Sequence, residues 1–289
     1  MVSGALLLPI KSSSFNFLSK RFTRIGIPLI AWTFIYLFLR VYNSESEINI
    51  LYSLFSLPFS NQGHGVLWFL YTILGLYLLS PIISTWLKKT SKRELEFYLL
   101  IWGITLCYPI IESFLYTNES TTGILYYFTG YVGYYILGYY LKNFSGKIIL
   151  VISGFFSVSG LIVILYLKYK NIEFEYYRLF WYLSIFMASW SVIYWYFARY
   201  IVKIITNFPL DLWMTKISNL TFGIYLIHIL IMREWLWKSN FILNISNYYL
   251  QTFIIFFLSF FISLIAVFLI SKIPYLKVIV GFKVKDAYT

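Results

Sequence analysis

The segment that decides the fold runs from Ile217 to Arg233, ISNLTFGIYLIHILIMR, and is long and apolar enough to cross a bilayer as a helix. It contains His228, one of the two histidines of the chain. An imidazole inside a membrane span is unfavourable unless it is paired or hydrated, and it exchanges a proton near neutral pH. His228 is therefore a candidate catalytic residue. The alternative is a packing histidine that is hydrogen-bonded to a neighbouring helix.

The composition of the chain is that of an integral membrane protein. Of its 289 residues, 60% are hydrophobic and only 12% are charged. A search for apolar runs of about 17 to 25 residues predicts eight spans, near residues 25–41, 65–86, 95–115, 123–141, 147–167, 179–197, 217–233 and 249–271. A shorter apolar segment, residues 2–10, precedes them. We therefore predict an all-α polytopic transmembrane helix bundle of eight full spans plus an N-terminal partial span, in one domain over residues 1–289.

The basic residues indicate the orientation of this bundle. The alternate loops 11–24, 88–94, 142–147, 198–216 and 272–289 hold 17 of the 23 Lys and Arg residues. Because cytoplasmic loops are enriched in Lys and Arg, these loops and the C-terminus are predicted to be cytoplasmic. The net charge of +12 then reflects topology, and no basic domain for nucleic-acid binding is expected.

Common motifs of metal and nucleotide enzymes are absent from the sequence. It has no H-E-x-x-H, no C-x-x-C, no G-x-S-x-G and no P-loop pattern. The one cysteine, Cys107, lies within a predicted span and has no partner for an intrachain disulfide. We expect neither a bound metal nor a permanently bound cofactor.

Cations concentrate in the first basic loop, KSSSFNFLSKRFTR, at the predicted cytoplasmic surface. Guanidinium and ammonium groups bind phosphate oxygens, and an arginine does so with a planar fork of donors. Lys20, Arg21 and Arg24 are therefore candidates to bind a phosphate-bearing ligand. The alternative is that they only fix the topology.

Three titratable residues fall in the predicted outer half of the bundle: His64, Glu112 and His228. A histidine oriented by a carboxylate is a competent general base toward a sugar hydroxyl. If the bundle brings the three residues together, they form a catalytic acid/base cluster. Alternatively, Glu112 lies solvated at the membrane interface and the three do not meet.

The predicted span 123–141, GILYYFTGYVGYYILGYYL, places two kinds of residue on separate helix faces. They are the tyrosines Tyr127, Tyr131, Tyr135 and Tyr139, and the glycines Gly123, Gly130 and Gly138. One interpretation is a glycine-packed helix whose tyrosines bond to neighbouring helices. The other is a hydroxyl-lined cavity for a polar substrate, with Tyr131 and Tyr135 as substrate-binding residues.

Short strings of residues follow one another in order along nearly the whole chain. They are Val2-Ser3-Gly4 with Ala5-Leu6-Leu7-Leu8; Lys20-Arg21-Phe22 with Arg24-Ile25, Pro28 and Trp32; Leu67-Trp68-Phe69-Leu70 with Leu76-Tyr77-Leu78-Leu79 and Pro81; the run from Gly133 to Tyr140; and the run from Phe222 to His228. Together these strings resemble the membrane acyltransferase 3 family, which includes bacterial O-acetyltransferases of surface polysaccharides. Trp68 and Tyr225, which lie in two of the strings, are further predicted substrate-binding residues.

The resemblance implies an enzyme of the bacterial cytoplasmic (inner) membrane that moves an acyl group, usually acetyl from acetyl-CoA, to a hydroxyl of a cell-surface polysaccharide or glycolipid. Arg21 and Arg24 match the family's basic stretch after the second span, where the phosphates of CoA would bind. The expected partners are membrane lipid, acyl-CoA and a glycan acceptor. The alternative function is a non-catalytic polysaccharide exporter on the same scaffold, with the tyrosine face as its sugar path.

The sequence departs from the family in one respect. Members similar to it carry, on their first span, an arginine followed about three helical turns later by the histidine regarded as central to acyl transfer. Here the nearest preceding arginines are Arg40 before His64 and Arg199 before His228. We therefore expect the domain to be N-terminally incomplete, without the first span and part of the second, and His228 to be a supporting histidine near the acceptor.

Overall fold

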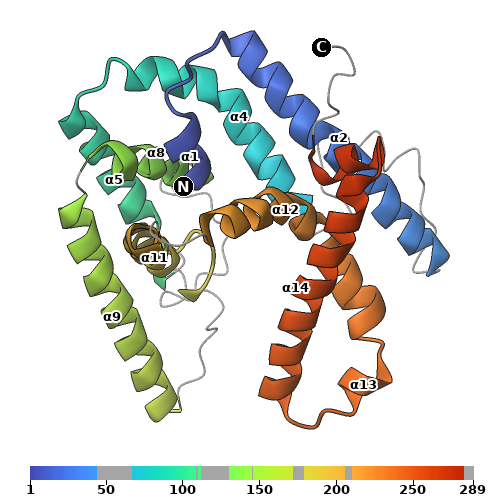
Figure 1. Ribbon diagram of the computed structural model, residues 1–289. Coiled ribbons are helices and arrows are strands. Elements are labelled where there is room, and N and C mark those ends of the chain that lie inside the picture. The colour runs from blue at the N-terminus through green and yellow to red at the C-terminus, as the bar shows by residue number, and fades with distance from the viewer. Residues whose placement is uncertain are drawn as a thin grey trace. The chain divides into compact units, whose positions relative to one another are not determined.

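The computed structural model describes residues 1–43, 67–108, 110–111, 130–144, 146–171, 179–205 and 210–282. These residues are mostly helical, and no strand occurs among them (Figure 1). The chain folds into two compact units. The first comprises Met1–Lys11 and Leu78–Asn207, and the second comprises Ser12–Tyr77 and Phe208–Thr289.

Within the described residues, five helical segments are long and apolar enough to cross a membrane. They are Ser14–Leu39 of α2 (Ser14–Tyr42), α4 (Trp68–Leu87), α9 (Lys147–Tyr169), Met214–Leu236 of α12 (Leu210–Leu230) and its continuation, and α14 (Tyr248–Lys272). The other three predicted spans overlap α5 (Lys92–Thr105), α8 (Tyr131–Asn143) and α11 (Ile185–Ile205). The prediction of an all-helical membrane protein is confirmed, whereas the number of eight spans and the cytoplasmic C-terminus stay predictions.

Two helices extend well beyond the apolar runs that predicted them. Helix α2 begins at Ser14 instead of residue 25, with the Ser13 hydroxyl accepting a hydrogen bond from the Asn16 amide as the N-cap. Helix α11 continues to Ile205, past the predicted end at residue 197. Lys and Arg are good helix formers, so basic residues continue a helix where hydropathy places a loop. The basic residues 20–24 and 199–203 therefore stand on helices.

In the first unit, the short helix α1 (Val2–Leu7) packs against α8 through glycines. A methyl group on Gly4 would clash with the Tyr135 carbonyl, and one on Gly138 would clash with the backbone of Met1. A second glycine of α8, Gly133, lies against the indole of Trp102 on α5. Small residues at these positions allow the close approach of helices that membrane packing favours. In the same unit, α9 packs against α11.

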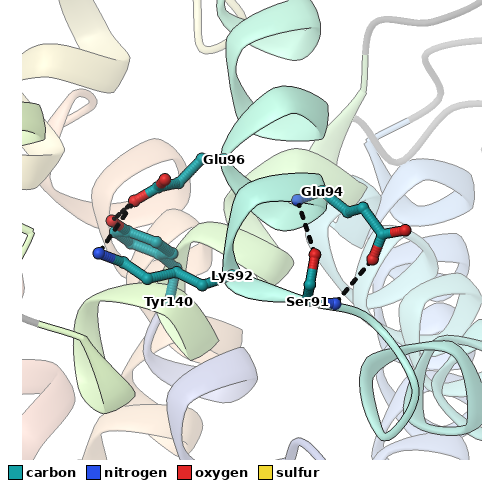
Figure 2. Close-up of polar contacts among 5 residues, drawn as sticks. All are labelled: Ser91, Lys92, Glu94, Glu96 and Tyr140. Carbon is teal, nitrogen blue, oxygen red and sulfur yellow. Dashed lines mark hydrogen bonds and ion pairs between the residues drawn. The ribbon is translucent and has the colours of Figure 1, made fainter.

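Helix α5 begins with a capping box (Figure 2). The Ser91 hydroxyl accepts from the Glu94 amide at 3.3 Å, and the Glu94 carboxylate accepts from the Ser91 amide at 2.7 Å. One turn further along, the Glu96 carboxylate accepts from the Tyr140 hydroxyl at 2.6 Å and pairs with Lys92 at 3.4 Å. The capping box stabilises the first turn of α5, and the hydrogen bond between Tyr140 and Glu96 joins the start of α5 to α8.

In the second unit, α12 and α14 pack together, and the 3-10 helix η3 (Leu276–Val280) lies against both and against α2. Two hydrogen bonds hold α2 in this unit. The Trp32 indole donates to the Ile279 carbonyl at 2.9 Å, and the Tyr36 hydroxyl donates to the Leu226 carbonyl at 2.9 Å. The second of these places the C-terminal part of α2 beside the last turns of α12, where His228 lies.

Candidate functional site

The orientation of His228 is fixed by its own helix. The side chain is half-buried in the last turn of α12, and its Nδ1 lies 2.6 Å from the Tyr225 carbonyl oxygen and 3.2 Å from that of Ile224. A carbonyl oxygen only accepts, so Nδ1 must carry a hydrogen. In the neutral ring the lone pair then resides on Nε2, which is the atom that can take a proton from a substrate hydroxyl.

Aromatic rings extend from His228 toward the start of α4. The Tyr225 ring lies 5.8 Å from the imidazole, Phe69 makes an edge contact with Tyr225 at 5.6 Å, and Trp68 contacts Phe69 at 6.0 Å. The structure thus brings two predicted substrate-binding residues, Trp68 and Tyr225, into one cluster with the histidine. Phe69, which neighbours Trp68 in the same family string, contacts both residues, and this position between them is visible only in the fold.

Immediately after His228 the helix changes type. Residues Ile231–Leu236 form the π-helix η2, a local form that occurs often at functional sites. The Ser259 hydroxyl of α14 donates to the His228 carbonyl at 3.2 Å, just before this change. The backbone beneath the histidine is therefore held by α14 as well as by its own helix.

The π-helix carries a carboxylate that sequence reasoning missed. The Glu234 carboxylate accepts from Lys238 at 2.6 Å and from the Asn43 amide at the end of α2 at 3.2 Å, and its side chain is 25% exposed. A carboxylate six residues after an intramembrane histidine was the available sequence signal. The spacing between His228 and Glu234 in the sequence gives no indication of the π-helix or of the hydrogen bond from Asn43.

The other two predicted catalytic residues, His64 and Glu112, lie outside the described residues. Their meeting with His228 in an acid/base cluster stays a prediction.

The predicted donor-binding cations stand on the first turns of α2. The Arg21 guanidinium lies 5.5 Å from the Phe17 ring and 5.7 Å from the Tyr77 ring, which contact each other edge to face at 6.0 Å. Such cation–π contacts stabilise the side chain by about 0.5–2 kcal/mol. Lys20 and Arg24 are exposed beside it. Arg21 is therefore held with its planar fork oriented, and Arg24 is its neighbour on the helix surface, three residues on.

The donor cations and the histidine are separated along α2. Arg21 precedes Tyr36 by 15 residues, which is about 22 Å of helix at 1.5 Å per residue. Tyr36 bonds to the Leu226 carbonyl, two residues before His228. This separation is most of the thickness of a hydrocarbon core, which is about 30 Å.

The two tyrosines predicted to bind substrate from α8 belong to the first unit. Tyr135 is 1% exposed and its hydroxyl shares a hydrogen bond of 2.8 Å with Ser80. Tyr131 stacks on Tyr134 at 6.4 Å, and the Tyr134 hydroxyl donates to the Tyr182 carbonyl at 2.7 Å. These contacts are those of the glycine-packed interpretation. Contact of Tyr131 and Tyr135 with a substrate stays a prediction.

A cavity of about 430 Å³ in the first unit lies among α5, α8, α9 and α11. Apolar side chains such as Leu99, Leu137 and Ile152 make up most of its wall, and the Glu96–Tyr140 pair belongs to its lining. From α8 it takes Leu137 and Tyr140, not the tyrosines of the predicted sugar path.

The described fold is that of an all-helical integral membrane protein with a histidine and a cationic cluster at separate levels of one unit. The sequence matches the acyltransferase domain family over residues 1–272, and the chain belongs to this membrane acyltransferase 3 family. No curated protein and no solved structure matches it significantly. The family match spans both compact units and supports membrane acyl transfer in general.

Proposed function

We propose that the protein transfers an acetyl group from acetyl-CoA to a hydroxyl of a cell-surface polysaccharide or glycolipid in the bacterial inner membrane. The observation that carries this proposal is the arrangement of the second unit. Its helix α2 bears the cations Arg21 and Arg24 near one end, and about 22 Å along its axis it bonds to the turn of α12 that carries His228. A phosphate-bearing donor and a hydroxyl acceptor would thus enter from opposite membrane faces.

The phosphates of acetyl-CoA would bind to the exposed cations at the start of α2. The planar guanidinium of Arg21, held between two rings, offers a fork of donors that matches phosphate oxygens. The acetyl thioester lies at the far end of the flexible arm of CoA. Binding of the phosphates at one level therefore lets the reactive carbonyl extend toward the histidine.

At the other level, Nε2 of His228 would accept the proton of the acceptor hydroxyl as the oxygen attacks the thioester carbonyl carbon. A C–O bond forms and the C–S bond breaks. The proton on Nε2 then passes to the departing sulfur, which regenerates the neutral histidine and leaves free CoA. The rings of Trp68, Phe69 and Tyr225 supply the flat apolar surface against which a sugar ring can pack.

The proposal is tested with the protein reconstituted in liposomes, with acetyl-CoA labelled on the acetyl group and a panel of surface glycans as acceptors. Base-labile label on a glycan that depends on the protein supports the proposal. His228→Ala and Arg21→Gln should each lower it, whereas Thr252→Ala, an exposed position of α14, should not. Glycan movement across the membrane without acetyl-CoA, and with no ester formed, would instead favour the exporter.

A further inference from the structure

The first unit contains a second cavity, of about 490 Å³, whose walls are cationic and aromatic. Its lining residues come from the C-terminal end of α8 and from the last turns of α11: Lys142, Asn143, Phe144, Tyr196, Arg199, Tyr200 and Lys203. None of these residues is acidic. The volume falls within the range of about 300–1,000 Å³ that is typical of small-ligand sites.

The cavity exists because α11 continues beyond the apolar run. Residues at positions i, i+3, i+4 and i+7 share one helix face. That spacing is followed by Tyr196, Arg199, Tyr200 and Lys203, so two cations and two tyrosine rings line one side of the cavity. The end of α8 supplies Lys142 and the Phe144 ring on the other side.

The connection between α8 and α9 shapes this wall. Gly146 has a φ of +55°, and a side chain there would clash with the Tyr196 hydroxyl, so the turn closes over that ring. Arg199 donates from Nη1 to the Leu141 carbonyl at 3.4 Å. A guanidinium has five N–H donors, and this bond uses one of them. Arg199 is thus anchored at the end of α8 and retains donors for an anion.

Membrane topology and helix dipoles explain only part of the arrangement of cations and rings around this cavity. Cations are expected in cytoplasmic loops and near helix C-termini, and Lys142 and Lys203 lie in the last turns of their helices. Neither effect requires three cations and three aromatic rings to line one cavity whose described wall residues include no carboxylate. The nearby Lys92 lies 5.9 Å from the Phe144 ring and pairs with Glu96, so that carboxylate is already engaged.

We propose that this cavity binds the phosphate group of an anionic ligand, with Arg199 as the fork and Lys142 and Lys203 as supporting charges. Two sources present this chemistry at a membrane surface: the headgroup of an anionic phospholipid and a soluble phosphate-bearing molecule. Near a membrane surface each cation contributes about 1 kcal/mol of attraction to anionic lipid. Binding of phosphate in this cavity does not require acyl transfer, so this proposal can be tested independently of the proposed function.

The experiment uses the full chain in nanodiscs and has two arms. In the first, discs of phosphatidylcholine with or without phosphatidylglycerol are compared, and the phosphatidylglycerol retained on the protein is counted by native mass spectrometry. In the second, inorganic pyrophosphate is titrated calorimetrically onto the protein in phosphatidylcholine discs. A site for lipid headgroups retains phosphatidylglycerol, whereas a site for soluble ligands binds pyrophosphate. Either result supports the proposal when it depends on Arg199.

Arg199→Gln should weaken the binding of whichever probe binds by about tenfold, the equivalent of roughly 1.4 kcal/mol for a lost charge-assisted bond. Lys147→Gln is the matched control, because it removes one exposed cation at the start of α9 that does not line the cavity. Arg199→Lys keeps the charge without the fork and should give an intermediate loss. Thermal unfolding of each variant verifies that it is folded. Equal effects of Arg199→Gln and Lys147→Gln, or no binding of either probe by the unmodified protein, would overturn the proposal.

Discussion

The imidazole Nδ1 of His228 and the carbonyl oxygen of Tyr225, one turn earlier in α12, are 2.6 Å apart. This hydrogen bond fixes the ring and assigns the lone pair to Nε2 without the help of a carboxylate. The helix itself therefore supplies the orientation that an acidic partner gives in many catalytic histidines.

Replacement of His228 by Ala should lower acetyl transfer by about 10²- to 10⁴-fold, the contribution of a positioned general base. The measurement is the rate of label transfer in liposomes at saturating acetyl-CoA. Thr252→Ala, at an exposed position of α14, is the control and should leave the rate unchanged. A rate for His228→Ala within twofold of the unmodified protein would show that the histidine only packs.

Replacement of Arg21 by Lys should raise the KM for acetyl-CoA by about tenfold, or roughly 1.4 kcal/mol, because a bidentate charge-assisted contact is lost. The kcat should change little, since Arg21 lies about 22 Å along α2 from the level of His228. Lys11→Gln removes an exposed cation from the same basic segment and should leave the KM unchanged. If both substitutions raise the KM equally, the cations act through general surface charge alone.

Replacement of Gly138 by Ala should destabilise the protein by about 1–3 kcal/mol, because its methyl group would meet the backbone of Met1 and overpack the α1–α8 contact. Gly154→Ala in α9 is the matched control, since nothing lies within 4 Å of the added carbon. That substitution should be neutral or stabilising by up to about 1 kcal/mol. Thermal unfolding in nanodiscs compares the two, and equal melting temperatures would refute the proposed contact.

Loss of the Ser91 hydroxyl should destabilise α5 by about 1 kcal/mol through the N-cap. The partner carboxylate adds a pH dependence. The hydrogen bond from the Ser91 amide lowers the pKa of Glu94 below its ordinary value of 4.5. The contribution of Glu94 is therefore fully present above pH 4.5 and is lost as the pH falls through the lowered pKa.

The corresponding measurement is the melting temperature of Glu94→Gln and of the unmodified protein between pH 7 and pH 3. The variant should melt lower at pH 7, and the difference should shrink as the solution is acidified. A difference that is constant over this range would show that the Glu94 carboxylate contributes nothing as an anion.

Apolar runs predicted the membrane helices well, because a helix in contact with lipid requires apolar side chains. Helices α9 and α14 were predicted to within two residues at each end. The start of α2 and the end of α11 were missed, since basic residues continue a helix without contributing to hydropathy. The cavity around Arg199 follows from that extension and was therefore invisible in the hydropathy pattern.

For the candidate site, the sequence singled out His228, because a costly residue in an apolar run is conspicuous. Trp68 and Tyr225 came from the family strings, and the roles of all three residues stay predictions. The sequence did not indicate the bond between Asn43 and Glu234, which joins residues far apart along the chain. No periodicity of a single helix encodes such a contact. The π-helix was equally hidden, since nothing in the sequence of Ile231–Leu236 distinguishes it from an α-helix.

The π-helix after His228 differs from the rest of α12 in its tolerance to a change in length. Its hydrogen bonds close one residue further along than those of an α-helix. The wider turn therefore accommodates one residue more than an α-helix does. Deletion of one residue between 231 and 236 would restore the α-helical pattern, and the helix on either side would keep its orientation. A residue deleted elsewhere in α12 would instead rotate the side chains on one side of the deletion by about 100° relative to those on the other.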